Sequence, residues 1–274
     1  MATLNLKKFE IDTIPNGSVI MMIGKRNTGK SFLVKRFCFG KRHIPICCAI
    51  SGTEGSNQFY SKIMPPIFIH DEYSSEVIAR MVKRQKLIVS KMNKQTDTYG
   101  RTDINPDCLI VLDDCLYDSG WTKDPEMRRL FMNGRHHKIT LVITSQFALS
   151  CPPNLRGQID YVFLLRENIV SNRKRLYDHF AGMVNTFEIF CQIMDQCTED
   201  YHCLVIDNTT KSNKLEDQLM WYKADDAPSF KMGDDKFWQY SQAHCANDDE
   251  EVETDINDIG KKKNALNIQV NKKY

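Results

Sequence analysis

The stretch Gly24-Lys25-Arg26-Asn27-Thr28-Gly29-Lys30-Ser31 constrains this chain more than any other part of its sequence. It has the pattern G-x-x-x-x-G-K-S, which is typical of a phosphate-binding loop for nucleoside triphosphates. Residues 18–23 before it form an apolar run of strand length, and residues 31–37 after it have the apolar spacing of a helix. A strand, the loop and a helix in this order are the context that the motif requires.

Each fixed residue of the loop has a chemical task. Gly24 and Gly29 let the backbone turn tightly, so that its N–H groups approach phosphate oxygens. Lys30 supplies a positive charge to the β- and γ-phosphates, and Ser31 supplies a hydroxyl to Mg²⁺. The N-terminus of the following helix faces the same anion. The sequence therefore predicts that residues 24–31 bind ATP together with Mg²⁺.

A second motif lies at residues 108–112, an unbroken apolar run that ends in Asp113 and Asp114. Such a run is typical of a strand buried in a parallel sheet, and open α/β sheets bind ligands at the carboxyl ends of their strands. We expect Asp113 to hold Mg²⁺ through water and Asp114 to orient and deprotonate the attacking water. Two acids after a strand are also typical of a simple turn, but the upstream phosphate loop favours the catalytic interpretation.

A third candidate is Gln146, which ends the apolar run 139–145. A polar side chain at that strand end could sense the γ-phosphate or its attacking water. The alternative is an ordinary loop glutamine, and the residue alone does not decide between the two.

Apolar strands alternate with helical segments along the chain, which predicts an α/β fold with a mainly parallel central sheet flanked by helices. Hydrophobic residues make up 42% of the sequence, which is enough to build a core. We expect strands at 18–23, 44–50, 66–70, 108–112, 139–146, 159–165, 201–207 and 220–223, and helices at 31–40, 74–94, 125–133, 171–182 and 187–196.

Composition sets further limits. No run approaches the roughly 18 apolar residues of a membrane span, and the N-terminal residues have no apolar secretory core. The ten cysteines contain no C-x-x-C pair, which favours free thiols in a reducing compartment over a zinc site. Residues 247–274 hold seven acids and five lysines, so residues 1–246 carry a net charge of +4, a mild bias toward polyanions.

The expected organisation has three parts. Residues 1–17 form a lead-in, and residues 18–233 form the ATPase domain. Residues 234–274 form a charged tail with few aliphatic residues, which we expect to be disordered.

Taken together, these motifs resemble the genome-packaging ATPases of nucleocytoplasmic large DNA viruses, within the FtsK–HerA group of P-loop motors. The resemblance covers residues 18 to about 185 in the family's order. Its six segments are residues 24–31, Ser51-Gly52-Thr53-Glu54, residues 109–114, Asn133-Gly134-Arg135-His136-His137, Thr144-Ser145-Gln146 and Leu164-Leu165-Arg166-Glu167. Residues 24–31 and 109–114 match motifs that occur in all P-loop ATPases, and the other four segments make the match specific.

The resemblance implies a RecA-like ATPase that assembles as a homo-oligomeric ring and pulls double-stranded DNA into a preformed capsid. It implies capsid or portal proteins as partners, and a place at the viral assembly site in the host cytoplasm or on the virion. Gln146 matches the polar sensor of the family. Arg135 is the candidate arginine finger that reaches the γ-phosphate of a neighbouring subunit, and Arg156 is its competitor.

Two basic clusters could grip DNA phosphates without reading sequence. One comprises Arg80, Lys83, Arg84, Lys86, Lys91 and Lys94, in a segment without an acid from residue 77 to residue 96, and the other is Arg173-Lys174-Arg175. The alternative for either cluster is a solvated helix face.

Two other functions fit parts of the sequence. A nucleotide or nucleoside kinase shares the phosphate loop, although the paired acids and Gln146 suit water activation better than transfer to an acceptor. An ATP-switched assembly scaffold would bind ATP and assemble without turnover that DNA stimulates.

Overall fold

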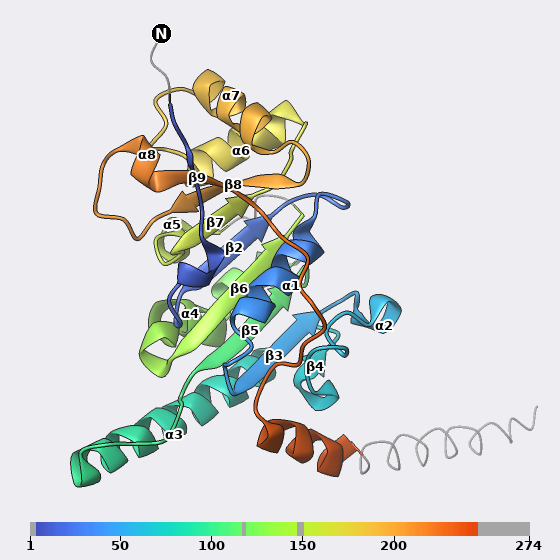
Figure 1. The fold of residues 1–274 in the computed structure, drawn as a ribbon, viewed down its shortest axis with the longest axis vertical. Coiled ribbons are helices and arrows are strands. Elements are labelled where there is room, and N and C mark those ends of the chain that lie inside the picture. Colours follow the sequence, from blue (N-terminus) through green and yellow to red (C-terminus); the bar gives the residue numbers. More distant parts are fainter. Residues whose placement is uncertain (1–3, 117–118, 147–150, 246–274) are drawn as a thin grey trace, which may run out of the picture.

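The computed structural model describes residues 4–116, 119–146 and 151–245, and it is built on one nine-stranded sheet (Figure 1). The strand order is β1-β9-β8-β7-β2-β6-β5-β3-β4, and of these strands β8 alone runs against the rest. The strands are β1 (Lys7–Lys8), β2 (Val19–Ile23), β3 (Ile46–Ser51), β4 (Ile69–His70), β5 (Cys108–Asp113), β6 (Ile139–Ser145), β7 (Tyr161–Leu164), β8 (His202–Asp207) and β9 (Leu219–Lys223).

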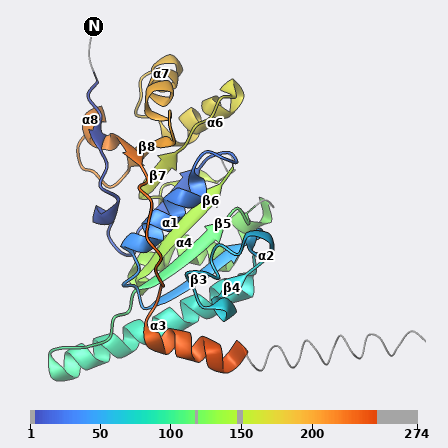
Figure 2. The same ribbon diagram turned by 45° about the vertical axis from the view of Figure 1, so that its right-hand side comes forward.

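Helices cover both faces of this sheet, so the expected α/β fold with a mainly parallel sheet is confirmed (Figure 2). They are α1 (Lys30–Gly40), α2 (Glu54–Asn57), α3 (Ser75–Tyr99), α4 (Pro125–Asn133), α5 (Pro153–Arg156), α6 (Val170–Phe180), α7 (Phe187–Cys197) and α8 (Leu215–Gln218), with a further helix at residues 235–245. Short 3₁₀ turns occupy Ile11–Thr13, Pro66–Phe68, Ser119–Lys123 and Gly134–His137.

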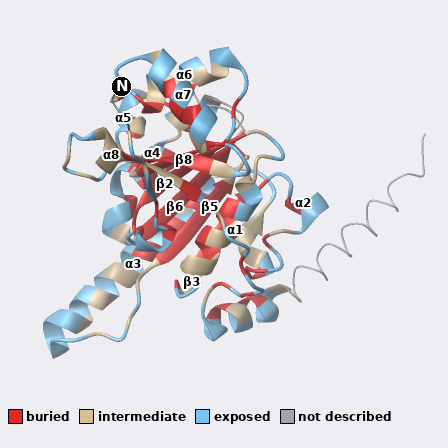
Figure 3. Cartoon of the chain, turned by 45° about the horizontal axis from the view of Figure 1, so that its top comes forward, coloured by how far each residue is buried: buried red, intermediate tan, exposed pale blue. Residues whose placement is uncertain are grey.

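The core has two layers, one on each face of the sheet. On one face α3, α4, α6 and α7 pack against side chains such as Met21 and Ile110. On the other face α1 packs against side chains such as Met22 and Val111. Because successive side chains of a strand point to opposite faces, the central strands are apolar on both sides, and every residue of β2 is buried (Figure 3).

The register places the functional ends of four strands along one edge. Ser51 pairs with Asp113, Asp113 with Thr144, and Ile23 with Ser145. The carboxyl ends of β2, β3, β5 and β6 therefore meet where the phosphate loop begins.

The predicted start of the tail at residue 234 differs from the structure. The chain crosses the α1 face after β9, where Met232 N–H donates to Ile63 O and Asp234 N–H donates to Pro45 O (Figure 1). The helix at 235–245 then buries Phe237 against Phe68, with ring centroids 4.4 Å apart. The charged residues around Phe237 in the sequence give no sign that it packs against Phe68. The rest of the predicted tail, 246–274, lies outside the described residues.

Among the described residues, none of the helices has both the length and the apolar character needed to cross a membrane. All ten cysteines carry free thiols. Burial raises the pKa of the Cys38 thiol to about 12, so this cysteine stays protonated and behaves as an apolar core residue.

Candidate active site

The phosphate loop connects β2 to α1, as the sequence predicts. Gly29 lies at the N-cap of α1 with φ of 95°, a left-handed conformation that glycine adopts without steric cost. Gly24 is required for a different reason, since a Cβ there would lie 2.6 Å from Thr28 Oγ1 and 2.7 Å from Leu165 Cβ. The Gly24 N–H donates to Ser145 O over 3.0 Å, which attaches the loop to the end of β6.

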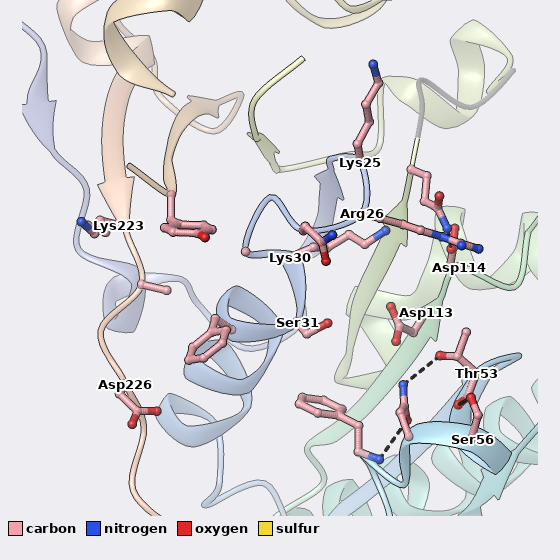
Figure 4. Close-up of a pocket in the computed structure, with 18 residues that line it drawn as sticks. Lys25, Arg26, Lys30, Ser31, Thr53, Ser56, Asp113, Asp114, Lys223 and Asp226 are labelled. Atoms are coloured by element: carbon pink, nitrogen blue, oxygen red, sulfur yellow. Dashed lines mark hydrogen bonds between the residues drawn. The ribbon is translucent and has the colours of Figure 1, made fainter. Parts of the chain in front are cut away.

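Lys25 of this loop is held by a buried acid. Its ammonium lies 2.6 Å from Glu167 Oε1, and the Glu167 side chain is 6% exposed. Glu167 also accepts hydrogen bonds from Ile169 N–H at 2.7 Å and from the Asn172 side chain at 3.0 Å. Burial opposes the charged form of Glu167, but these donors and Lys25 hold its pKa below the usual value. The Lys25 side chain points away from the acids of the site (Figure 4).

Lys30 and Ser31 begin α1 and face the acidic strand ends (Figure 4). Burial lowers the pKa of Lys30, and the negative charges of Asp114 and Asp113 oppose this effect. The Lys30 ammonium therefore lies partly desolvated beside two carboxylates, where its interaction with phosphate oxygens would be stronger than in water.

Asp113 is surrounded by hydroxyl groups. The Thr144 hydroxyl donates to its Oδ1, and the Ser51 hydroxyl donates to its Oδ2 over 3.4 Å. Thr144 and Ser51 are almost fully buried on the two strands that flank β5. These bonds orient the carboxylate toward the pocket, where the Ser31 hydroxyl faces it (Figure 4).

Asp114 has an unusual backbone, with φ of 52° in the left-handed region. Non-glycine residues in this region carry strain and cluster at functional sites. The Asp114 N–H donates to Thr144 Oγ1 over 3.1 Å, and the Gln146 amide donates to Asp114 Oδ2. The side chains of Asp114 and Gln146 are therefore in direct contact.

These side chains share a cavity of about 1050 Å³ that opens beside the phosphate loop. Lys30, Ser31, Asp113, Asp114 and Gln146 all line it, so the structure brings these five predicted residues together. Hydroxyl and carboxylate oxygens are the ligands that Mg²⁺ prefers, and it commonly uses one or two carboxylates together with phosphates. Ser31 and Asp113 fit that pattern.

Several further residues line the cavity for which the sequence predicts no role. Thr53 and Asn57 form one wall at α2, where the Asn57 amide donates to Thr53 Oγ1 over 3.1 Å (Figure 4). Phe32 and Tyr201 contribute exposed aromatic rings. The polar loop after β3 was a usable signal for Thr53, whereas nothing in the sequence near Tyr201 indicates a contact with residues 170 positions earlier.

The two arginine candidates lie elsewhere. Arg135 sits in the 3₁₀ turn before β6 and contacts Asp160 at 3.3 Å, close to the start of β2. Arg156 ends α5, just before β7. Arg135 precedes β6, whose far end leads to Gln146, and a strand of seven residues spans about 23 Å. In the described part of the chain neither arginine lines the cavity.

Comparison with known proteins gives the family. No model of a known protein family matches the sequence. The chain is 34% identical to an uncharacterized protein of Acanthamoeba polyphaga mimivirus, over 97% of this chain and 95% of the relative. It is 40% identical to an uncharacterized protein of Invertebrate iridescent virus 6, over 77% and 78% of the two chains. This chain belongs to their family. The family spans mimivirus and iridescent viruses, which confirms the expected relation to nucleocytoplasmic large DNA viruses.

The fold of this chain is that of P-loop NTPases. The genome-packaging NTPase from Sulfolobus turreted icosahedral virus 2, solved with AMPPCP, superposes with a TM-score of 0.51 at 14% identity, over 77% of this chain and all of that one. The pCW3 conjugation coupling protein TcpA superposes with a TM-score of 0.50 at 12% identity, over 81% of this chain and 62% of that one. At such low identity the likeness shows the fold, and the predicted P-loop fold is confirmed.

Proposed function

We propose that this protein hydrolyses ATP and uses the energy to move viral double-stranded DNA into a capsid. The observation that carries the first half is the meeting of two motifs in one cavity. Lys30 and Ser31 of the phosphate loop lie opposite Asp113 and Asp114, and Gln146 donates to Asp114. This set can bind a triphosphate, hold Mg²⁺ and activate water.

Each residue has a defined task in this proposal. The backbone N–H groups of residues 24–31 and the Lys30 ammonium bind the phosphates, and Ser31 and Asp113 hold Mg²⁺. When bound, Mg²⁺ neutralises charge on the β- and γ-phosphates. Asp114 orients the attacking water and accepts its proton, while Gln146 senses the γ-phosphate through its contact with Asp114.

The DNA part of the proposal is supported by the fold, since its structural neighbours include a genome-packaging NTPase of another virus. It is also supported by helix α3, which is 25 residues long and extends past the sheet (Figure 1). Its outer half is largely exposed (Figure 3). A protruding helix of this kind offers a surface that the core of the protein does not use.

Basic residues form a stripe along α3. At 3.6 residues per turn, Arg80, Lys83, Arg84, Lys91 and Lys94 fall within an arc of about 100°, and they span about 21 Å of helix. The buried side chains Ile78, Met81 and Val82 lie on the other side. In the part of the chain that the structure describes, no ion pair within 4.0 Å neutralises this stripe. Arg84 is partly buried and donates to the Gln85 side chain, so Arg80, Lys83, Lys91 and Lys94 are the exposed cations of the stripe. Exposed cations in a row suit a phosphate backbone.

The second basic cluster is less available. The Arg173 guanidinium contacts Asp195 at 2.6 Å, and the Lys174 ammonium contacts Asp178 at 2.9 Å. Lys174 also lies over the ring of Tyr177, 4.7 Å from its centroid. Two of the three charges therefore already have partners, which favours α3 as the DNA-binding element.

We further propose that the protein works as a homo-oligomeric ring in which Arg135 completes the site of the next subunit. An arginine that acts across an interface has to lie outside its own cavity, and Arg135 meets this condition with a side chain that is 48% exposed. Arg156 also lies outside its own cavity. Mixing Arg135→Ala protein with Asp114→Asn protein should restore turnover, and failure of that mixture with intact rings would favour Arg156.

Capsid or portal proteins are the proposed assembly partners, at the viral assembly site in the host cytoplasm or on the virion. The FtsK–HerA group is the proposed class of motor.

The experiment that tests this function is ATP turnover with and without long linear double-stranded DNA, at low and moderate salt. We expect marked stimulation by duplex that weakens as salt screens the phosphates. Lys30→Ala protein, which loses phosphate binding, is the control. Turnover that ignores DNA would support an ATP-switched scaffold, and transfer of phosphate to an added nucleoside or nucleotide would support a kinase.

A further inference from the structure

Two exposed aromatic rings line the active-site cavity on the side away from the catalytic acids. Tyr201 is 67% exposed and Phe32 is 58% exposed. Tyr201 directly precedes β8, which is separated from β2 by β7. Asp113 ends β5 and Asp114 follows it, and β5 is separated from β2 by β6. The phosphate loop after β2 therefore lies between the acids and Tyr201.

The Tyr201 ring is held in this place by an unusual turn. Asp200 and Tyr201 have φ of 47° and 61°, so two consecutive non-glycine residues adopt the left-handed conformation. Such residues are strained and persist where the surrounding structure fixes them. The His202 N–H donates to Glu199 O over 2.8 Å and closes this turn. Burial of the Tyr201 ring does not offset this backbone strain, because the ring is exposed.

The ring rests on the phosphate loop itself. A Cβ on Gly29 would lie 3.3 Å from Tyr201 Cδ1 and 3.6 Å from Tyr201 Cβ. The absence of a side chain at Gly29 therefore leaves room for the tyrosine. Phe32 follows one residue after Ser31, on the first turn of α1. Both rings are thus adjacent to the loop that would hold the phosphates.

The end of β9 and the residues after it close the same end of the cavity. Lys223, Ala224 and Asp226 line it, and Figure 4 shows Lys223 and Asp226 across the phosphate loop from Asp113 and Asp114. The Asp226 carboxylate contacts the Lys35 ammonium of α1 at 3.2 Å, which ties this segment to the helix. The cavity therefore has an acidic end for the γ-phosphate and an aromatic end beyond the loop.

We propose that Tyr201 and Phe32 bind the base of the nucleotide, with a preference for purines over pyrimidines. This inference rests on the proposed function, because it needs a triphosphate on residues 24–31. A triphosphate whose γ-phosphate faces Asp114 places its sugar and base toward the other end of the cavity. Aromatic side chains stack on the face of any base, and the larger purine face gains more contact than a pyrimidine.

The test measures the contribution of the base to binding separately from that of the phosphates. Binding of ATP and of inorganic tripolyphosphate is measured by calorimetry on wild type and on Tyr201→Gly, since glycine fits φ of 61° without strain. We expect Tyr201→Gly to weaken ATP about 10- to 100-fold, the range of one stacked base, and to leave tripolyphosphate unchanged. Tyr201→Phe should bind ATP like wild type. Tyr99→Ala, which removes an exposed ring at the end of α3, is the matched control.

A second readout uses the four nucleoside triphosphates. Wild type should bind ATP and GTP more tightly than CTP and UTP, and Tyr201→Gly should reduce that difference. Unchanged ATP affinity in Tyr201→Gly would overturn the base site, and a changed oligomeric state with unchanged affinity would assign the ring to a subunit contact instead. Lys30→Ala should weaken both ATP and tripolyphosphate. If wild type binds neither ligand, the phosphate site itself fails, and that outcome is distinct from failure of the base site alone.

Discussion

The contact between Lys25 and Glu167 yields the most quantitative prediction. Replacing Glu167 with glutamine removes the charge but keeps an oxygen that can accept from Ile169 N–H or Asn172. A hydrogen bond to a charged group contributes about 1.5–3 kcal/mol. Because the Lys25 side chain is 37% exposed and water screens part of the attraction, we expect Glu167→Gln to lower the free energy of unfolding by about 1 kcal/mol.

The measurement is thermal unfolding followed by circular dichroism. For a chain of this size 1 kcal/mol corresponds to a fall in Tm of about 2–4 °C. Asp178→Asn is the matched control, because it breaks a lysine–acid contact of 2.9 Å whose two side chains are about half exposed. That change should alter Tm by less than about 1 °C. Equal Tm values for Glu167→Gln and wild type would show that the Lys25–Glu167 charge pair does not stabilise the fold.

The Lys25–Glu167 pair also predicts how the stability of the fold changes with pH. The pKa of Glu167 is lowered in the folded protein, so its charge stabilises the fold above the unfolded pKa of about 4.3. This contribution is lost as pH falls through the lower, folded pKa. The Tm difference between wild type and Glu167→Gln should therefore be constant between pH 6 and pH 8 and should close below about pH 4. A difference that persists at pH 3 would show that burial or shape, and not charge, is responsible.

Three further predictions concern the loop, the acids and α3. Gly24→Ala should weaken ATP binding at least about tenfold, because its Cβ would lie 2.6 Å from Thr28 Oγ1, and wild-type affinity in calorimetry would contradict this. Asp114→Asn should bind ATP normally but lose at least about 99% of turnover in a phosphate-release assay, since water loses its base. The double change Lys83→Glu and Lys91→Glu should weaken duplex binding and reduce its salt slope by about 2, measured by fluorescence anisotropy. Lys7→Glu and Lys8→Glu, on edge strand β1, provide the matched charge control.

The central part of the fold could be predicted because its strands are buried on both faces. β2, β5 and β6 have almost continuous apolar sequences, and the phosphate loop fixes which strand precedes α1. The ends of elements were harder to place. Helix α3 continues to Tyr99 rather than stopping near residue 94, and Gly100, with φ of 70°, ends it. The helix at 235–245 was missed because its stability depends on Phe68, far away in the sequence.

The acidic half of the site could also be predicted, because motifs and sheet register both place it at the ends of adjacent strands. Asp113, Thr144 and Ser51 are brought together by parallel pairing, which a sequence pattern can anticipate. Tyr201 could not be predicted in this way. Its contact with Gly29 depends on the turn between α7 and β8, and no motif marks that turn. Local sequence patterns thus predict the acidic and polar residues at the strand ends. Only the fold shows that Tyr201 lines the opposite wall of the cavity.

Translocation along DNA is tested by displacement of a fluorescent third strand from a long linear duplex. A motor that moves along DNA removes a triplex-forming oligonucleotide in its path, whereas a kinase or a scaffold does not. We predict that wild-type protein displaces it with ATP and Mg²⁺, and that Lys30→Ala, Asp114→Asn and a non-hydrolysable ATP analogue each abolish displacement. Wild-type protein that binds the duplex and hydrolyses ATP but leaves the third strand in place would contradict a DNA-translocating motor.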